Sequence, residues 1–152
     1  MTLSISSTAF APGNPIPVDY SCKGRNISPA LAWAGAPGGT ASFALIVDDP
    51  DAPSGTFVHW VIYNIPSASK GLPEAVATAP TLPDGTLQGR NGAGSQHYEG
   101  PCPPSGTHRY FFKLYALDAE LDLKAGATAA QLLQAMQSHI LAQGELMGTF
   151  SK

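Results

Sequence analysis

Glycine and proline interrupt this chain throughout its length, with 16 glycines and 14 prolines among 152 residues. Both residue types favour tight turns, and proline also breaks helices. The mainly apolar runs between them are of strand length, at residues 43–47, 57–66 and 108–118. This pattern argues against a long helical architecture and predicts short strands joined by many turns.

The three runs are expected to be central strands. Residues 43–47 are continuously apolar, which is typical of a strand that is buried on both faces. The other two runs are rich in aromatic and β-branched side chains, which suit a packed sheet surface. Strict alternation along the second run would place His59 on the face opposite Trp60. Further strands are expected around residues 3–7, 31–33, 86–88 and 140–150.

One helix is expected late in the chain. Thr128 can cap it, and the residues at capping-box or helical spacing are Gln131, Leu132, Leu133, Met136 and Ile140. Because strands dominate and no βαβ unit repeats, the predicted fold class is mainly β, largely antiparallel, with a peripheral C-terminal helix. The length fits a single domain over residues 1–152.

The charge balance excludes several classes of partner. The 8 Lys and Arg residues against 11 Asp and Glu residues give a net charge of −3 at pH 7, and no basic run occurs. Neither a nucleic-acid surface nor an electrostatic membrane anchor is expected. No apolar run approaches a membrane span, and the N-terminus lacks a signal-peptide pattern, so a soluble cytoplasmic protein is the simplest interpretation.

Cofactor motifs are missing from the sequence, which contains no P-loop, GxGxxG or GxSxG pattern. Cys22 and Cys102 form no metal-binding pair, and free thiols are the favoured interpretation. The two cysteines could still approach each other in space, and the sequence leaves their redox state open. We therefore expect no cofactor and no metal ion.

Two stretches hold the residues with chemical potential. Residues 47–64 contain a proline-rich acidic turn between two apolar runs, and residues 100–110 place a second histidine after a similar turn. In the first stretch, a chain reversal could bring Asp49 or Asp51 within hydrogen-bonding reach of His59. The functional question is whether the two stretches share one pocket.

A pocket formed by Asp49, His59, His108 and Tyr110 would suit an anion. A carboxylate that accepts one imidazole N–H fixes the ring, and the other ring nitrogen is then expected to be a directed donor. Two such donors, a phenol hydroxyl and backbone N–H groups near Gly106 would form a concavity for phosphate.

Other interpretations of these residues are open. Histidine or tyrosine on an apolar strand face is often a satisfied core residue, and aspartate beside proline is often a turn former. A metal site of two histidines and an aspartate is the weaker alternative, because the close ligand spacing of zinc enzymes is absent. By alternation, Arg109 should point away from the pocket and serve as a structural ion-pair partner or hydrogen-bond donor. The irregular stretch 67–100 could be a wall of the site or a mobile insertion.

The motifs DDPDAP at 48–53, HW at 59–60 and GPCPPSGTHRY at 100–110 resemble the phosphatidylethanolamine-binding protein family, in its bacterial Raf-kinase-inhibitor-like branch. The resemblance covers nearly the whole chain and includes ISPALAW before the first motif. It implies two antiparallel sheets in a Greek-key arrangement, with a small pocket for phosphate or phosphorylated head groups. It also implies a cis peptide bond between Ala52 and Pro53.

The pocket residues that this resemblance implies are Asp49, Asp51, His59, His108 and Tyr110, with Pro53, Gly100, Pro101 and Pro103 at the rim. The implied ligand is phosphate or a phosphoethanolamine-type molecule, the implied protein target is a kinase or a protease, and similar bacterial members often form homodimers. Residues 91–94 read NGAG and lack the acidic and aromatic residues that bacterial relatives commonly carry there.

The favoured function is a non-catalytic binding or regulatory protein with a small anion pocket, which could act as a kinase or protease inhibitor. The alternative is a phosphoester hydrolase or transferase that uses His59 or His108 as general acid or base, with Asp49 as the orienting partner. The sequence offers no evident nucleophile for that alternative.

Overall fold

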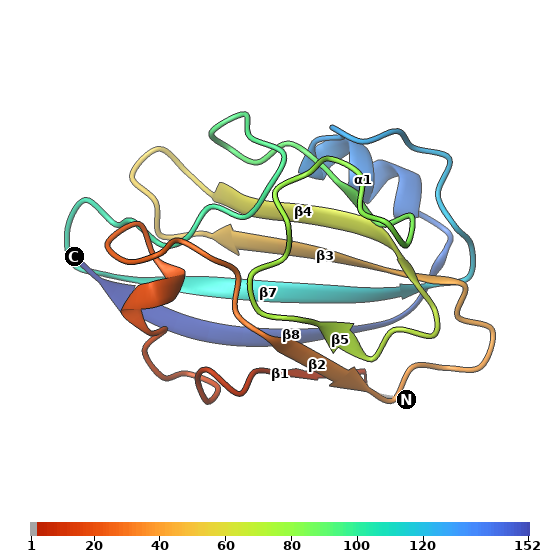
Figure 1. Ribbon diagram of the computed structural model, residues 1–152, viewed down its shortest axis with the longest axis horizontal. Coiled ribbons are helices and arrows are strands. Elements are labelled where there is room, and N and C mark those ends of the chain that lie inside the picture. Colours follow the sequence, from red (N-terminus) through yellow and green to blue (C-terminus); the bar gives the residue numbers. More distant parts are fainter. Residues whose placement is uncertain (1–2) are drawn as a thin grey trace.

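The computed structural model describes residues 3–152 and folds them into two antiparallel sheets (Figure 1). Met1 and Thr2, which the predicted domain includes, lie outside the described residues. The smaller sheet has the order β1-β2-β5, made of Ser4–Ser6, Leu31–Ala34 and Gly71–Leu72. The larger sheet has the order β6-β4-β3-β7-β8, made of Leu87–Gln88, Phe57–Pro66, Ser42–Asp49, Thr107–Leu117 and Ile140–Ser151. The helical elements are the 3-10 turn η1 at Val18–Tyr20 and the helix α1 at Ala129–Met136.

The larger sheet is a Greek key. β3 and β4 form an antiparallel hairpin, β6 pairs with the outer side of β4, and β7 then returns to pair with the other side of β3. A fourth strand that lies beside the first defines this topology. The expected fold class, mainly β with two antiparallel sheets and a C-terminal helix, is confirmed.

Burial on both faces explains the apolar run in β3. All residues of this strand are buried. Phe43, Leu45 and Val47 belong to the core between the two sheets. Ala44 and Ile46 belong to a second core on the other face, which α1 covers. The larger sheet is thus the middle layer of the molecule.

The helix begins where the sequence predicted and ends earlier. The Thr128 side chain accepts a hydrogen bond from the Gln131 backbone N–H, and the Gln131 side chain accepts one from the Thr128 N–H, so the capping box is complete. Leu132 and Met136 are buried. Ile140 is not a helical residue, because the chain reverses at Ser138, whose φ is 70°, and continues into β8.

The stretch 67–100 is more ordered than the single weak strand expected. β5 pairs with β2, and β6 pairs with β4, so this stretch is attached to both sheets. The buried Gln88 side chain accepts a hydrogen bond from Trp60 Nε1 at 2.7 Å and donates to the carbonyls of Ala77 and Ala79. These contacts hold the stretch against the larger sheet.

Three long strands have ends at the same edge of the molecule. β3 finishes at Asp49, β4 starts at Phe57 and β7 starts at Thr107. Their connecting loops, together with η1, gather at the left in Figure 1. Within residues 3–152, no helix has the length and apolarity needed to cross a membrane.

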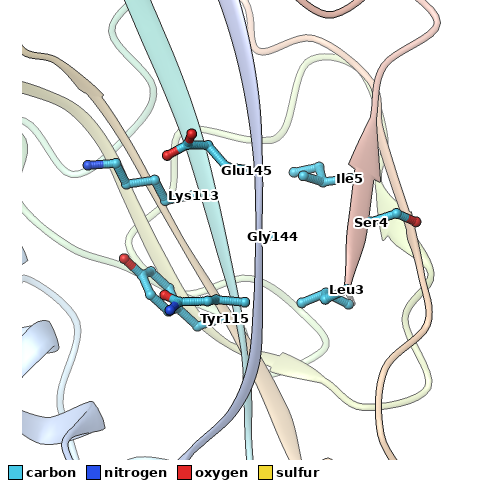
Figure 2. A pocket seen from close by; sticks show the side chains of 8 residues that line it. Leu3, Ser4, Ile5, Lys113, Tyr115, Gly144 and Glu145 are labelled. Carbon is cyan, nitrogen blue, oxygen red and sulfur yellow. The ribbon is translucent and has the colours of Figure 1, made fainter. Parts of the chain in front are cut away.

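A hollow of about 730 Å³ lies elsewhere, between β1 and β8 (Figure 2). Leu3 and Ile5 line one side, and Lys113 and Glu145 are among the residues on the other. No residue of the predicted anion pocket contributes to this hollow. Gly144 lies on β8, and a Cβ atom there would overlap the carbonyl oxygen of Leu3.

Replacing Gly144 with Ala should lower the free energy of unfolding by about 1–3 kcal/mol, because the chain before β1 must move away from β8. Urea denaturation followed by tryptophan fluorescence measures the change. Gly38→Ala is the matched control, since a Cβ atom at Gly38 would meet nothing within 4 Å. Equal stabilities of the two variants would contradict the close approach of the two segments.

Candidate functional site

A cavity of about 230 Å³ opens where β3 ends and β4 and β7 begin. The predicted site residues that line it are Asp49, Pro53, His59, Gly100, Pro103, His108 and Tyr110. Residues that sequence reasoning did not place there are Ala52, Phe57, Ala93, Glu99, Cys102 and Pro104. Both of the stretches singled out in the sequence therefore contribute to one cavity. The stretch 67–100 supplies part of its wall.

Asp51 and Pro101 are predicted site residues that do not line the cavity. The Asp51 carboxylate accepts hydrogen bonds from Arg109 Nε and Nη2, each at 2.9 Å. Hydrogen bonding and charge from Arg109 lower the pKa of Asp51 to about 2. Arg109 thus forms the structural ion pair that alternation suggested, and the pair joins the β3–β4 turn to β7. The Pro101 carbonyl accepts a hydrogen bond from the Cys22 N–H behind the wall.

A β-bulge in β4 brings His59 to the cavity. Val47 pairs with Trp60 and Asp48 pairs with Val58, so His59 is the extra residue between them. Trp60 packs in the core between the sheets, and the His59 ring lies 5.2 Å from the ring of Tyr110 on the same side. The expectation that His59 and Trp60 face opposite sides was wrong, because alternation fails at a bulge.

Asp49 contacts His108 rather than His59. Its Oδ2 atom lies 2.6 Å from His108 Nδ1, and both side chains are buried. The register explains this choice, because Asp49 pairs with Phe57 on β4, while the preceding residue, Asp48, pairs with Phe111 on β7. Asp49 therefore lies beside the first residues of β7. The expected contact between a carboxylate and an imidazole forms, but with the second histidine.

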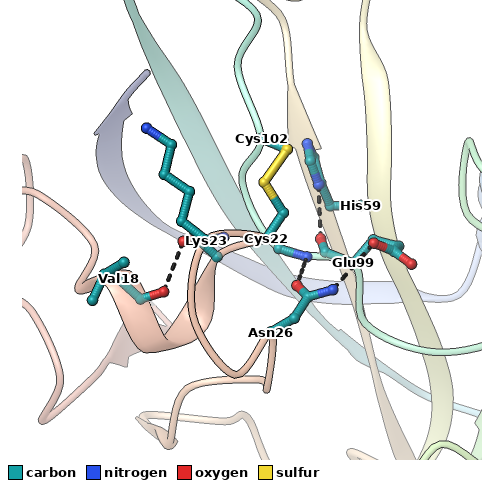
Figure 3. The surroundings of a disulfide bond; sticks show 9 residues. Val18, Cys22, Lys23, Asn26, His59, Glu99 and Cys102 are labelled. Atoms are coloured by element: carbon teal, nitrogen blue, oxygen red, sulfur yellow. Dashed lines mark hydrogen bonds between the residues drawn. A yellow bond between two sulfur atoms is a disulfide. The ribbon is translucent and has the colours of Figure 1, made fainter.

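His59 has a different partner, the backbone carbonyl of Glu99, which lies 2.7 Å from Nδ1 (Figure 3). A carbonyl can only accept, so Nδ1 carries the hydrogen. Burial lowers the pKa of His59 by more than its hydrogen bond and the nearby acidic groups raise it. The Nε2 atom of the neutral ring is then an acceptor. The expectation that the second ring nitrogen donates holds only for the charged imidazole.

Tyr110, a further residue of the cavity lining, carries a hydroxyl group that differs from the other polar groups. It is buried and has no hydrogen-bond partner in the described part of the chain. Burial, with the charges of Asp49 and Asp51, raises the pKa of Tyr110, so the phenol stays protonated and can donate. Its ring lies near both imidazoles, with ring centroids 5.2 Å from His59 and 6.5 Å from His108.

A disulfide between Cys22 and Cys102 closes one wall, as Figure 3 shows. The favoured interpretation as free thiols was wrong. The segment of this wall at residues 99–102 runs beside the loop at residues 20–26. The Gly100 N–H donates to Asn26 Oδ1 at 2.8 Å, and the Cys22 N–H donates to the Pro101 carbonyl. These contacts join positions 80 residues apart in sequence, which spacing alone could not reveal.

The turn between β3 and β4 also differs from expectation. No cis peptide bond occurs among residues 3–152, so Ala52 and Pro53 are joined by a trans bond. The reversal is completed by Gly55, which has a φ of 106° and donates its N–H to the Ala52 carbonyl at 3.1 Å. A glycine in the left-handed region supplies the bend that a cis proline would otherwise provide.

The altered loop at residues 91–94 packs against the site. The buried Asn91 side chain accepts hydrogen bonds from the backbone N–H groups of Ala93 and Ser95 and donates to the His97 carbonyl. A Cβ atom at Gly92 would overlap the Phe57 ring. Without the acidic and aromatic side chains, the loop still closes over Phe57 and places Ala93 at the cavity. No group of three or more potential metal ligands occurs within residues 3–152.

The fold and the cavity define a two-sheet antiparallel β-protein with a small, largely buried polar site at one end of its larger sheet. The profile of the family described as phosphatidylethanolamine-binding protein matches residues 6–151. The chain belongs to this family. Membership supports a binding or regulatory role in general terms.

Similar proteins cover the whole fold. A UPF0098 protein of Methanothermobacter thermautotrophicus is 52% identical over 150 residues, which is 99% of each chain. The crystal structure of CT736 of Chlamydia trachomatis, a putative homologue of phosphatidylethanolamine-binding protein, is 42% identical with a TM-score of 0.92, covering 99% of this chain and 98% of that one. The structure of E. coli YbcL, described as a new member of the mammalian family, is 32% identical with a TM-score of 0.91, covering 100% and 99%.

Replacing both Cys22 and Cys102 with Ser should lower the free energy of unfolding by about 2–4 kcal/mol, because the disulfide closes a long loop in the unfolded chain. Denaturation with and without a thiol reductant tests this. The reductant should destabilise the wild-type protein to a similar extent and leave the double variant unchanged. A reductant effect on the variant would point to a cause other than this bond.

Nitrogen-15 NMR of the imidazoles should detect the Nδ1–H tautomer of His59 at neutral pH, with titration below the ordinary pKa of about 6.5. The reason is that the Glu99 carbonyl holds the hydrogen on Nδ1 while burial disfavours the charged ring. His139, which is exposed, serves as a reference in the same spectra. An Nε2–H tautomer at His59 would rule out the assigned contact.

Proposed function

We propose that this protein is a non-catalytic binding protein whose cavity holds a phosphate group, either free or in a phosphorylated head group such as phosphoethanolamine. The observation that carries the proposal is the buried Tyr110 hydroxyl, which has no partner in the described residues and belongs to a residue that lines the cavity. A buried donor without a partner costs free energy that a bound acceptor would recover. The family to which the chain belongs adds support.

The surroundings of this hydroxyl favour a small and polar ligand. A volume of about 230 Å³ is below the range of drug-sized sites, and it suits an ion or a short head group. The imidazoles of His59 and His108 are each held through Nδ1, which leaves their Nε2 atoms for a ligand. Pro53 and Pro103 stiffen the rim. Such a preformed site loses little conformational entropy on binding.

A phosphoester hydrolase or transferase is the second candidate, and one observation favours it. The buried hydrogen bond between Asp49 and His108 is the arrangement in which a carboxylate orients a general base. Release of phosphate from a generic phosphomonoester, and loss of that activity in His108→Ala, would favour this candidate. Binding of the same ester without turnover would favour the binding protein.

Replacing Tyr110 with Phe should weaken binding of inorganic phosphate by roughly 3- to 10-fold, because one hydrogen bond to the ligand is lost. The unliganded protein should be as stable as wild type or slightly more stable, since an unpaired buried hydroxyl is removed. Isothermal titration calorimetry and thermal denaturation measure the two effects. Tyr115→Phe, outside the cavity, is the matched control. Unchanged phosphate affinity in Tyr110→Phe would exclude this hydroxyl as a ligand contact.

A further inference from the structure

The donor and acceptor properties of the cavity restrict its ligand more than its size does. The Glu99 carbonyl fixes the hydrogen of His59 on Nδ1, so the Nε2 atom of the neutral ring offers a lone pair. The ring is held in place on two sides, since the rings of Phe57 and Tyr110 pack edge-on against it at centroid distances of 4.9 and 5.2 Å. Rotation of the ring would break the Glu99 contact and these packing contacts together.

The charged and titratable groups that face His59 are Asp48, Asp49, Glu99, His108 and Tyr110. Burial lowers the pKa of His59 more than the acidic groups raise it, so the ring is neutral at neutral pH. Its Nε2 atom then repels any oxygen that brings no hydrogen. An anion without a proton can form a hydrogen bond with His59 Nε2 only if the ring is first protonated.

Among the described residues, lysine and arginine side chains do not compensate negative charge in the cavity. No lysine or arginine of residues 3–152 lines the cavity. Arg109, which follows His108, is bound to Asp51 outside it. Meanwhile the Asp49 carboxylate is buried at the cavity wall. A doubly charged oxyanion therefore meets the buried Asp49 carboxylate, which is already paired with His108 at 2.6 Å, and the lone pair of His59, with no lysine or arginine from the described part of the chain to compensate its charge. Such an arrangement is costly in a buried site.

We propose that the cavity selects a protonated phosphoryl group, which donates its P–OH hydrogen to His59 Nε2 and accepts a hydrogen bond from the Tyr110 hydroxyl. The preferred ligands are dihydrogen phosphate and phosphomonoester monoanions. Sulfate and phosphodiesters, which carry no such hydrogen near neutral pH, are discriminated against. This inference rests on the proposed function and specifies the ligand class for the same site.

The selectivity arises from which partner supplies the shared hydrogen. A phosphomonoester loses its second proton with a pKa of about 6, and inorganic phosphate does so closer to neutrality, so both bring a hydrogen at mildly acidic to neutral pH. For their hydrogen bond with His59, sulfate and diesters can use only a hydrogen that the ring has taken up, and the lowered pKa of His59 makes that uptake costly. The pH profiles should therefore differ between the two kinds of ligand.

The test is a set of calorimetric titrations at constant ionic strength between pH 5 and pH 8, with inorganic phosphate, phosphoethanolamine, glycerophosphoethanolamine and sulfate. At pH 7 we expect phosphate to bind at least about fivefold more tightly than sulfate or the diester, the discrimination expected when a buried acceptor is left unpaired. Phosphate affinity should fall above the second pKa of the ligand. Sulfate affinity should rise only as the pH falls through the pKa of His59.

The outcomes separate the two proposals. If none of the four ligands binds at millimolar concentration, the proposed function fails. If phosphate and sulfate bind equally at pH 7, the phosphate site stands but its selection of a protonated ligand is overturned. Equal binding of phosphoethanolamine and glycerophosphoethanolamine would overturn it too, because their shared ammonium group would then supply the hydrogen.

A variant adds an independent readout. His59→Gln provides an amide that can donate as well as accept, so the ratio of phosphate to sulfate affinity should fall toward one. His139→Gln is the matched control, because His139 pairs with Asp118 beyond the opposite end of β7 and should leave the ratio unchanged. An unchanged ratio in folded His59→Gln protein would overturn the proposal. Should that variant fail to fold, the wild-type pH profiles still decide.

Discussion

Burial of β3 on both faces is the constraint on which the rest of this structure depends. A strand with apolar residues on both faces needs a covering layer on each, and the smaller sheet and α1 provide them. It also needs neighbours on both edges, which β4 and β7 supply. The strand stays buried to its last residue, Asp49. Apolar surroundings alone cannot accommodate the charged side chain of this residue. A buried carboxylate requires a donor, and the register of β7 offers His108. The polar site therefore lies where the core ends.

One irregularity turns this end of the sheet into a cavity with two imidazoles. In a regular strand the residue before Trp60 would point to the face that α1 covers. The bulge opposite Val47 and Asp48 turns His59 to the same side as Trp60, next to Tyr110. Bulges are common beside binding sites because they redirect a side chain at small cost to the sheet. The apolar pairs that precede the bulge along β3, such as Ile46 with Val61, keep β4 in register.

The sequence was sufficient for features that depend on local pattern. Apolar runs predicted the central strands, and Thr128 with Gln131 predicted the capping box, because burial periodicity and capping are short-range properties. Features that depend on register or on distant contacts were not accessible. That Asp49 contacts His108 and not His59 depends on strand register. The Cys22–Cys102 bond joins loops that approach each other only in the folded chain. The trans bond before Pro53 was also not accessible, because it belongs to a turn whose conformation depends on the positive φ of Gly55.

The chemistry of the cavity depends on its wall as much as on its histidines. The Glu99 carbonyl fixes the tautomer of His59, and that carbonyl is positioned by the adjacent Gly100 N–H, which donates to Asn26, and by the disulfide that follows at Cys102. If the wall moved away, His59 could carry its hydrogen on either ring nitrogen. It would then lose its preference for a ligand that brings its own hydrogen. A neutral backbone carbonyl makes this control possible. A carboxylate in the same place would stabilise the charged ring and favour any anion. Selection between oxyanions can thus depend on one main-chain oxygen.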